Sequence, residues 1–203
     1  YRRGRKTTHV VYGEDMGILA GDALLNYAFE TAFKAFVTDP ENSLLTVRAL
    51  TVLGEKAGIY GMIGGQVIDV RETGHSVSKD MLDTIYKLKT SALIEASMMI
   101  GAILGGVSEE EVKKVEKIAE YVGKAFQIQD DILDVESTAE VLGKPIRSDE
   151  KNDKTTYVTL LGLEGAKKEV EKLSDEAIRL LHKLSGENEY LERLLLWLVH
   201  RNR

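Results

Sequence analysis

Apolar residues recur every three to four positions along most of this chain, which is the spacing that buries one face of an α-helix. Alternating apolar and polar runs, as expected for β-strands, are nearly absent, and no hairpin dipeptide separates two such runs. The pattern predicts an all-α protein with a single helical domain over residues 1–203. Helices are expected at about 15–37, 42–72, 79–105, 109–136, 155–162, 164–184 and 188–201, with a short turn near 138–142.

Capping residues support several of these boundaries. Ser78 precedes one predicted helix, and Ser108 is followed directly by glutamates, which is the pattern of a capping box. Glycines stand near three predicted ends, at Gly74, at the Gly105-Gly106 pair and at Gly186. The starts and stops therefore agree with the periodicity.

Composition and charge exclude several functional classes. The net charge of −6 gives little electrostatic support for a nucleic-acid partner. The absence of cysteine excludes disulfides, thiolate metal ligands and cysteine nucleophiles. The longest apolar stretch, Leu93 to Val107, contains Glu95 and is too short to cross a bilayer. With no secretory signal in view, we expect a cytoplasmic protein without membrane insertion.

Three aspartates, Asp130, Asp131 and Asp134, fall within five residues of one predicted helix. At about 100° per residue, Asp130, Asp134 and Gln127 share an arc beside the apolar stripe, and Asp131 points further round. Gly123 lies one turn earlier in this arc and is expected to leave room above it. Carboxylates crowded beside an apolar face persist most easily around a divalent cation. The pattern predicts a metal site, and a solvated acidic helix edge is the alternative.

A second predicted helix has a nearly bare face. Gly58, Gly61 and Gly65 recur at helical spacing and lead to Gln66 and Asp69. Each glycine inside a helix costs about 1 kcal/mol relative to alanine, so a compensating interaction is expected. Close helix packing and a ligand against the backbone are both consistent with the pattern, and Asp69 favours the ligand.

Basic residues complete the set. Lys89 lies within the apolar stripe of its predicted helix beside Thr90, where it either extends to solvent or pairs with an anion. Lys144 and Lys154 stand in a lysine-rich loop directly after the acidic helix; most such loops are solvated surface. Carboxylates for Mg²⁺, several cations and an apolar helical cavity occur together. This combination predicts that the ligand is a diphosphate attached to a hydrocarbon. No nucleotide P-loop and no nucleophile elbow occurs.

Short motifs occur in a fixed order along the whole chain. They are Arg2-Arg3-Gly4 with Thr7-Thr8-His9, Leu19 to Leu25, Gly64 to Asp69, Lys89 to Leu93, Phe126 to Asp134, Gly143-Lys144, Asp149 to Tyr157 and Arg201-Asn202-Arg203. Together they resemble the trans-isoprenyl diphosphate synthase family, and most closely its bacterial farnesyl diphosphate synthases, which are geranyltranstransferases.

The resemblance implies an isoprenoid-synthase-type helical bundle around a central cavity, commonly homodimeric. It implies a prenyltransferase that joins an allylic diphosphate, dimethylallyl or geranyl, to isopentenyl diphosphate. In the family, Mg²⁺ and basic residues remove the allylic diphosphate, and the alkene attacks the resulting carbocation before a proton is lost. A short-chain product, farnesyl diphosphate, is expected.

The resemblance also implies roles for individual residues. Asp130 would bind the metal directly, and Asp131 and Asp134 would hold metal-bound water. Gln127, the Thr90 hydroxyl and the preceding backbone carbonyl would direct oxygen dipoles at the carbocation. The allylic diphosphate would be bound by Arg2, Lys89, Lys144 and Lys154, and isopentenyl diphosphate by Arg3.

Two departures from the family pattern matter. Lys6 stands where proline is usual, a loop change that should be tolerated. The first aspartate-rich motif of the family lies upstream of Arg2, so we expect this chain to be the C-terminal portion of a longer fold, with impaired turnover alone. A non-catalytic subunit, an inactive fragment and a terpene cyclase are alternatives. Asp130, Lys89, Gln127 and Lys144 argue against a non-catalytic subunit. The Lys89-Thr90 pair and the Gln66 to Asp69 element favour a chain-elongating enzyme over a cyclase.

Overall fold

The computed structural model describes residues 4–136, 154–186 and 188–199. Apart from turns and connections these residues are helical, and no β-strand occurs among them, so the all-α prediction is confirmed. The turn expected near 138–142 and three predicted site residues, Arg2, Arg3 and Lys144, lie outside the described residues. The single-domain organisation stays a prediction.

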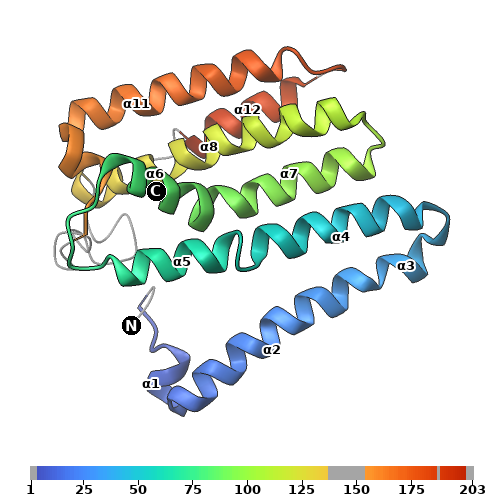
Figure 1. Cartoon of the computed structure of the whole chain (residues 1–203), viewed down its shortest axis with the longest axis horizontal. Helices are drawn as coiled ribbons and strands as arrows, with labels where there is room; N and C mark the ends of the chain where they lie inside the picture. The colour runs from blue at the N-terminus through green and yellow to red at the C-terminus, as the bar shows by residue number, and fades with distance from the viewer. Residues whose placement is uncertain (1–3, 137–153, 187, 200–203) are drawn as a thin grey trace.

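The helices form a stack (Figure 1). Helices α4 and α5 follow one another along a line between α2 and α7, and α8 lies between α7 and α11. The elements are α1 (Thr8–Tyr12), α2 (Glu14–Phe33), α3 (Ala35–Thr38), the 3₁₀ turn η1 (Pro40–Asn42), α4 (Ser43–Ala57), α5 (Met62–Arg71), α6 (Lys79–Tyr86), the π-helical turn η2 (Lys87–Ser91), α7 (Ala92–Leu104), α8 (Glu109–Glu136), α11 (Tyr157–Leu181) and α12 (Glu189–Val199).

Helix α8 is the centre of the core. It packs against α7 and α11 and also contacts α6, η2 and α12. Its residues Ile118, Val122 and Ile128 are buried and join Tyr157 and Leu181 of α11 in the main hydrophobic cluster. Because burial of apolar area contributes about 25 cal/mol per Å², this cluster holds α8 firmly in place. The acidic C-terminal end of α8 is thereby fixed beside α5, η2 and the start of α11.

The prediction of one continuous helix over 42–72 is wrong, because a non-helical connection separates α4 from α5. Helix α4 ends at Ala57, and α5 begins at Met62. A Cβ atom at Gly61 would lie 2.0 Å from the carbonyl oxygen of Lys56, so the connection is too tight for a side chain. Gly58 and Gly61 therefore belong to a connection and do not form a bare helix face.

The helix predicted over 79–105 is interrupted by the π-helical turn η2. A π-turn contains one more residue than an α-turn, so it rotates the residues on its two sides relative to one another. Lys89 and Thr90 both lie in η2. Such turns occur frequently at functional sites, and here the turn presents two of the predicted site residues.

The remaining boundaries agree with the sequence to within a few residues. The side chain of Ser78 accepts a hydrogen bond from the Met81 backbone N–H, and that of Ser108 accepts one from Glu111, both at 3.3 Å. Within α11 the backbone is non-helical at Gly162, with a φ of 72°, so two helical segments meet at a kink there, in agreement with the helices expected over 155–162 and 164–184. The helix expected over 15–37 is divided at Lys34.

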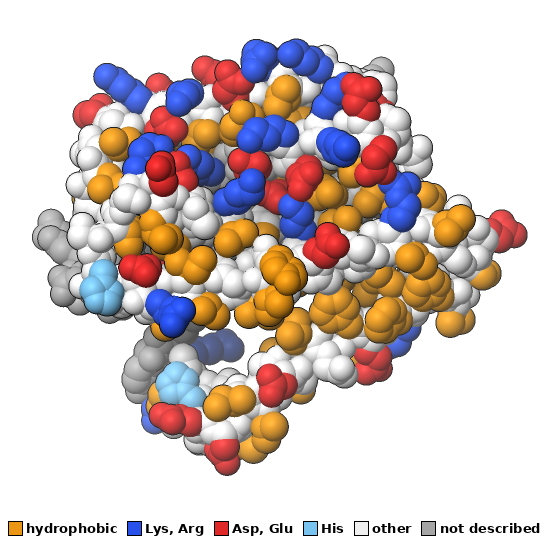
Figure 2. All heavy atoms as spheres, in the orientation of Figure 1, with side chains coloured by type: hydrophobic (Ala, Val, Ile, Leu, Met, Phe, Trp, Pro, Cys, Tyr) orange, Lys and Arg blue, Asp and Glu red, His pale blue; other side chains and the backbone are white. Residues whose placement is uncertain are grey.

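Helix α2 is 20 residues long, and none of its residues is buried. Ile18, Leu19, Leu24 and Tyr27 are all more than half exposed. Hydrophobic side chains gather over α2, α3 and α4 at the lower right of Figure 2, whereas charged ones gather over the upper helices. No described helix is both long enough and apolar enough to span a membrane.

Replacing Gly65 with alanine is expected to destabilise the fold by about 1–3 kcal/mol, the usual cost of overpacking a core. A Cβ atom there would lie 2.3 Å from the backbone nitrogen of Lys89 and 2.7 Å from the carbonyl carbon of Leu88. Helix α5 would have to move away from η2. Urea unfolding measures the change.

The matched control is Gly101→Ala in α7, where an added Cβ meets nothing within 4 Å. This change should be neutral or stabilising by about 0.5–1 kcal/mol, because alanine restricts the unfolded chain. Equal effects of the two substitutions would contradict the close packing of α5 on η2.

Candidate functional site

Two lysines from distant parts of the chain meet on one carboxylate. Lys89 of η2 and Lys154, three residues before α11, both contact Oδ2 of Asp69 on α5, at 2.6 Å and 2.8 Å. The sequence predicted both lysines as diphosphate ligands, and the structure brings them together. Their side chains are 33% and 26% exposed, so the ammonium groups remain accessible from solvent.

The charge balance of this group favours an anion. Burial alone would raise the pKa of Asp69, but hydrogen bonds from Lys154 and Lys89 outweigh it and hold the pKa below its usual value. Asp69 is therefore ionised at neutral pH. The two ammonium groups and the one carboxylate carry one net positive charge among themselves, which lets the lysines hold a phosphate oxygen; Glu72 and Asp131 also line the cleft.

A row of hydrogen bonds extends from η2 into α8. The Thr90 hydroxyl lies 2.7 Å from Oε1 of Gln127, and Nε2 of Gln127 lies 3.3 Å from Oδ1 of Asp131. Oδ2 of Asp131 accepts hydrogen bonds from the Tyr86 hydroxyl and from the Tyr157 backbone N–H. Thr90 and Gln127, two of the predicted site residues, thus contact one another.

The three aspartates of α8 lie in different environments. Asp131 and Asp134 are buried, with 3% and 2% of their surface exposed, whereas Asp130 is half-buried. The room expected above Gly123 does not exist, because a Cβ atom there would lie 2.5 Å from Ser91 Oγ. Gly123 instead allows η2 to pack closely on α8.

The donor set is compatible with Mg²⁺ held together with substrate. Within residues 4–136, 154–186 and 188–199, no group of three or more His, Cys, Asp or Glu side chains is arranged to hold a metal ion. Mg²⁺ prefers oxygen ligands and is often held by one or two carboxylates, with water and substrate phosphate supplying the rest. Asp130 is the most exposed of the three aspartates, so it fits such a role. The metal assignment of Asp130, Asp131 and Asp134 stays a prediction.

A small cleft joins the lysines to the hydrogen-bonded row. It encloses about 80 Å³ and is lined by residues of α5, α6, η2 and α8 and by Lys154 to Thr156, among them Asp69, Lys89, Gln127 and Asp131. A second hollow of about 420 Å³, mostly apolar, lies between α7, α8 and α12. The two share none of their described lining residues.

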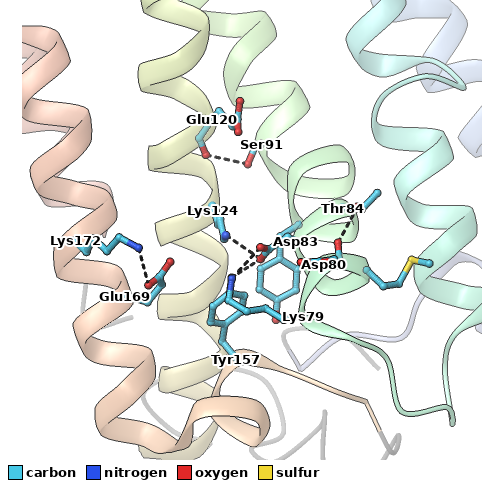
Figure 3. A network of polar contacts seen from close by, with 12 residues as sticks. Lys79, Asp80, Asp83, Thr84, Ser91, Glu120, Lys124, Tyr157, Glu169 and Lys172 are labelled. Atoms are coloured by element: carbon cyan, nitrogen blue, oxygen red, sulfur yellow. Dashed lines mark hydrogen bonds and ion pairs between the residues drawn. The ribbon is translucent and has the colours of Figure 1, made fainter.

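A polar network anchors the start of α11 beside this cleft (Figure 3). The buried Tyr157 donates its hydroxyl hydrogen to Oδ1 of Asp83, which Lys124 also contacts at 2.8 Å. The ammonium groups of Lys79 and Lys124 each lie 5.3 Å from the centre of the Tyr157 ring, a cation–π distance. The network fixes Tyr157 and, three residues before it, Lys154.

Replacing Asp83 with asparagine is expected to lower the free energy of unfolding by about 1–2 kcal/mol at neutral pH, because charged hydrogen bonds are lost. Burial raises the pKa of Asp83, but hydrogen bonds from Lys124, Tyr157 and Lys79 outweigh it and lower the pKa from 3.8. A carboxylate with a depressed folded pKa contributes stability above its unfolded pKa and loses it as pH falls through the folded pKa. The difference between wild type and variant should therefore shrink below about pH 4.

Urea unfolding between pH 7 and pH 3 measures this difference. The control is Asp80→Asn on the same helix, whose side chain lies outside the network. A difference that stays constant across this range would contradict the ion-pair network.

Three residues of this region, Tyr86, Asp83 and Lys124, were not predicted from the sequence. Lys79 and Asp83 have the four-residue spacing of a helical ion pair, which is a weak signal. Tyr86 precedes Lys89 by about one turn, but its partner Asp131 is 45 residues away. Partners at such separations depend on the packing of α6 against α8, and local pattern does not reveal them.

The sequence of residues 1–194 matches the polyprenyl synthetase family. The chain belongs to this family. It is 39% identical over 193 residues to farnesyl diphosphate synthase of Bacillus subtilis (strain 168), a match covering 95% of the chain and 65% of that protein. It is 42% identical over 179 residues to the heterodimeric geranylgeranyl pyrophosphate synthase large subunit 1, chloroplastic, of Arabidopsis thaliana, covering 87% of the chain and 48% of the relative. The chain thus spans about half to two-thirds of the length of these relatives.

Solved structures agree with this polyprenyl synthetase fold. A Helicobacter pylori geranyltransferase, complexed with magnesium and isoprenyl diphosphate, superposes with a TM-score of 0.83 at 33% identity, over 98% of the chain and 64% of that structure. A geranylgeranyl pyrophosphate synthase superposes with a TM-score of 0.87 at 25% identity, over 100% of the chain and 74% of that structure. The isoprenoid-synthase-type bundle predicted from the sequence is confirmed.

Proposed function

We propose that the protein containing this chain is a prenyltransferase that joins an allylic diphosphate, dimethylallyl or geranyl, to isopentenyl diphosphate. One observation carries the proposal: Lys89 and Lys154 converge beside Gln127 and Thr90, in a polyprenyl synthetase bundle. A cationic pair next to neutral oxygen dipoles suits a substrate that separates into a diphosphate and a carbocation.

The lysine pair supports binding and departure of the allylic diphosphate. Its ammonium groups lie close enough together to contact the same phosphate, and they remain partly exposed. When the phosphate group arrives, it shares the two cations with Asp69, so the anion site is organised before substrate binds. By resemblance, Arg2 and Lys144 would bind the same diphosphate, and Arg3 that of isopentenyl diphosphate.

The acids at the end of α8 support binding of Mg²⁺. Asp130 would hold the ion directly and Asp134 would act through water, as the resemblance implies. The resemblance implies the same for Asp131, but both of its oxygens accept hydrogen bonds from Gln127, Tyr86 and Tyr157. Bound there, the ion would act as a Lewis acid and neutralise charge that develops on the leaving diphosphate. The Helicobacter pylori structure, which contains magnesium and isoprenyl diphosphate, supports this cofactor.

Gln127 and Thr90 support the stage after ionisation. Thr90 and Gln127 form one hydrogen-bonded pair, and Gln127 lines the cleft. Preorganised oxygen dipoles aimed at developing positive charge lower the barrier without reorganisation during the reaction. These two residues, with Lys89, are the ones we assign to catalysis.

The product is proposed to be short, and farnesyl diphosphate is our first candidate. The relatives include a farnesyl synthase from Bacillus subtilis and geranylgeranyl synthases from Arabidopsis thaliana and Cyanophora paradoxa. Both product lengths are therefore represented among similar proteins. Chromatography of the dephosphorylated products distinguishes C15 from C20.

The deciding experiment incubates the full-length protein with Mg²⁺, labelled isopentenyl diphosphate and dimethylallyl or geranyl diphosphate. A labelled prenyl product that disappears with EDTA is expected. No product from the complete protein would refute the enzyme and favour a non-catalytic subunit. Residues 1–203 alone are expected to turn over weakly or not at all.

A homodimer is the proposed assembly, and the apolar exposed surface of α2 supports it. A 20-residue helix without a buried residue suggests that another surface covers it in the working protein. Light scattering of the full-length protein and of Leu24→Glu tests this, with dissociation expected for the variant. A cytoplasmic location stays a prediction, and the Arabidopsis relative is named as chloroplastic.

A further inference from the structure

The second aspartate of the acidic motif has protein donors on both of its oxygens. Oδ1 of Asp131 accepts from Gln127 Nε2 at 3.3 Å. Oδ2 accepts from the Tyr86 hydroxyl and from the backbone N–H of Tyr157, the latter at 3.4 Å. Tyr157 is the first residue of α11, so this N–H has no partner within its own helix. The buried carboxylate therefore caps α11 and contacts Gln127 at the same time.

These contacts fix the direction of every hydrogen bond in the row. The NH₂ group of Gln127 donates to Oδ1 of Asp131, so the amide is oriented with its carbonyl oxygen on the other side. Its carbonyl oxygen Oε1 then faces Thr90, and the Thr90 hydroxyl must donate to it. Once its hydrogen is used in this way, the Thr90 oxygen has only lone pairs left for any other partner.

We propose that Asp131 is a positioning residue that sets this polarity, acting through Gln127 on Thr90. The backbone N–H of Tyr157 cannot reverse, so it holds the carboxylate in one orientation. A hydroxyl that turned its hydrogen toward a carbocation would repel it, whereas lone pairs attract it. The consequence for catalysis rests on the proposed prenyl transfer; the polarity of the row does not.

The structure gives a sharp test in Asp131→Asn, which keeps the size of the side chain. Two donors, from Tyr86 and Tyr157, require an oxygen at the position of Oδ2, so the new NH₂ group must face Gln127. The Gln127 amide must then reverse and present its own NH₂ to Thr90. The Thr90 hydroxyl would become an acceptor, with its hydrogen turned away from Gln127. Turnover of the full-length protein should fall by about 10²-fold, similar to loss of one preorganised catalytic dipole.

The matched variant is Gln127→Glu, tested alone and together with Asp131→Asn. Alone, it places a second carboxylate against Asp131, and the two repel. In the double variant, the carboxylate at position 127 accepts from the amide at 131 and from Thr90. The original direction of the Thr90 hydroxyl and the net charge of the pair are both restored. We expect the double variant to be at least tenfold faster than either single variant.

Thermal unfolding of the four proteins supplies a readout that does not depend on activity. Each single variant should lower the unfolding midpoint, and the double variant should lower it by less than the sum of the two. Failure of this coupling overturns the proposed polarity. If the coupling is present but the wild type forms no prenyl product, the polarity holds and the prenyltransferase function fails.

The Mg²⁺ dependence separates this role from metal binding. Asp131→Asn should lower kcat with little change in the Mg²⁺ concentration at half-maximal rate, whereas Asp130→Asn should raise that concentration. The half-maximal Mg²⁺ concentration could rise in Asp131→Asn without being restored by the added Gln127→Glu change. That result would place Asp131 on the metal and overturn the proposal. A wild-type rate of turnover in Asp131→Asn would also overturn the proposal.

Discussion

Replacing Asp130 with alanine in the full-length protein is expected to reduce the rate of prenyl transfer by about 10²–10³-fold, the range seen when one electrostatic group is removed from an active site. Asp130 is half-buried at the end of α8, where the other two aspartates of the motif are buried. It is therefore the carboxylate best placed to share Mg²⁺ with a diphosphate in solvent contact. Steady-state kinetics over a range of Mg²⁺ concentrations measures the loss.

Stability should change far less than rate. Alanine is a strong helix former, and the substitution leaves the buried core of α8 untouched, so a loss of no more than about 1 kcal/mol is expected. Asp175→Ala on the exposed face of α11 is the control, since it removes a carboxylate of the same kind far from the cleft in sequence. An unchanged rate in Asp130→Ala would show that this aspartate does not hold the metal.

Replacing Lys56 with methionine is expected to destabilise the fold by about 3 kcal/mol, the lower end of the cost of leaving a buried charge unpaired. Lys56 of α4 contacts Glu95 of α7 and, at 2.6 Å, Glu116 of α8. Glu95 is only 2% exposed, and its second oxygen, Oε1, has no hydrogen-bond partner among the described residues. Without Lys56, nothing in this group would compensate the charge of Glu95.

The loss should depend on pH in a defined direction. Burial raises the pKa of Glu95 above its ordinary value even with Lys56 beside it, and loss of Lys56 raises the pKa further. A carboxyl group whose folded pKa is raised binds protons more tightly in the folded state, so the variant gains stability as pH falls toward that pKa. Urea unfolding from pH 7 to pH 5 should show a shrinking difference from wild type.

A double variant tests the cause. Lys56→Met combined with Glu95→Leu removes both buried charges, and such replacements are often neutral or stabilising. The double variant should recover most of the stability that Lys56→Met loses, because Glu116 is partly exposed and can be hydrated. A loss below about 1 kcal/mol in the single variant would contradict the burial of an ionised Glu95.

The sequence predicted what depends on local pattern. Helix α8 was correctly bounded because its apolar stripe has a regular period and Ser108 caps its start. Thr90 and Gln127 were both predicted as site residues from motifs of the same family, but the hydrogen bond between them was not predicted. Lys89 and Lys154 were predicted to bind one anion, and the structure places them on one carboxylate.

What the sequence left open depends on packing between distant segments. Gly58, Gly61 and Gly65 fitted either close packing or a ligand, and the structure shows close packing for Gly65 against η2. The break at residues 58–61 was missed because glycine is tolerated in helices and in connections alike. The buried partners of Asp131 were missed because Tyr86 and Tyr157 precede and follow it by 45 and 26 residues.

The π-helical turn η2 has a consequence for how this region tolerates insertions and deletions. A regular α-helix would form readily if one residue between Lys87 and Ser91 were deleted, so the local backbone would survive the change. All of α6, however, would rotate by about 100° and shift by about 1.5 Å relative to α7. Tyr86 would turn away from Asp131 and Asp83 away from Tyr157. Gene variants that differ in length at this point should therefore be rarer than variants that differ in residue type.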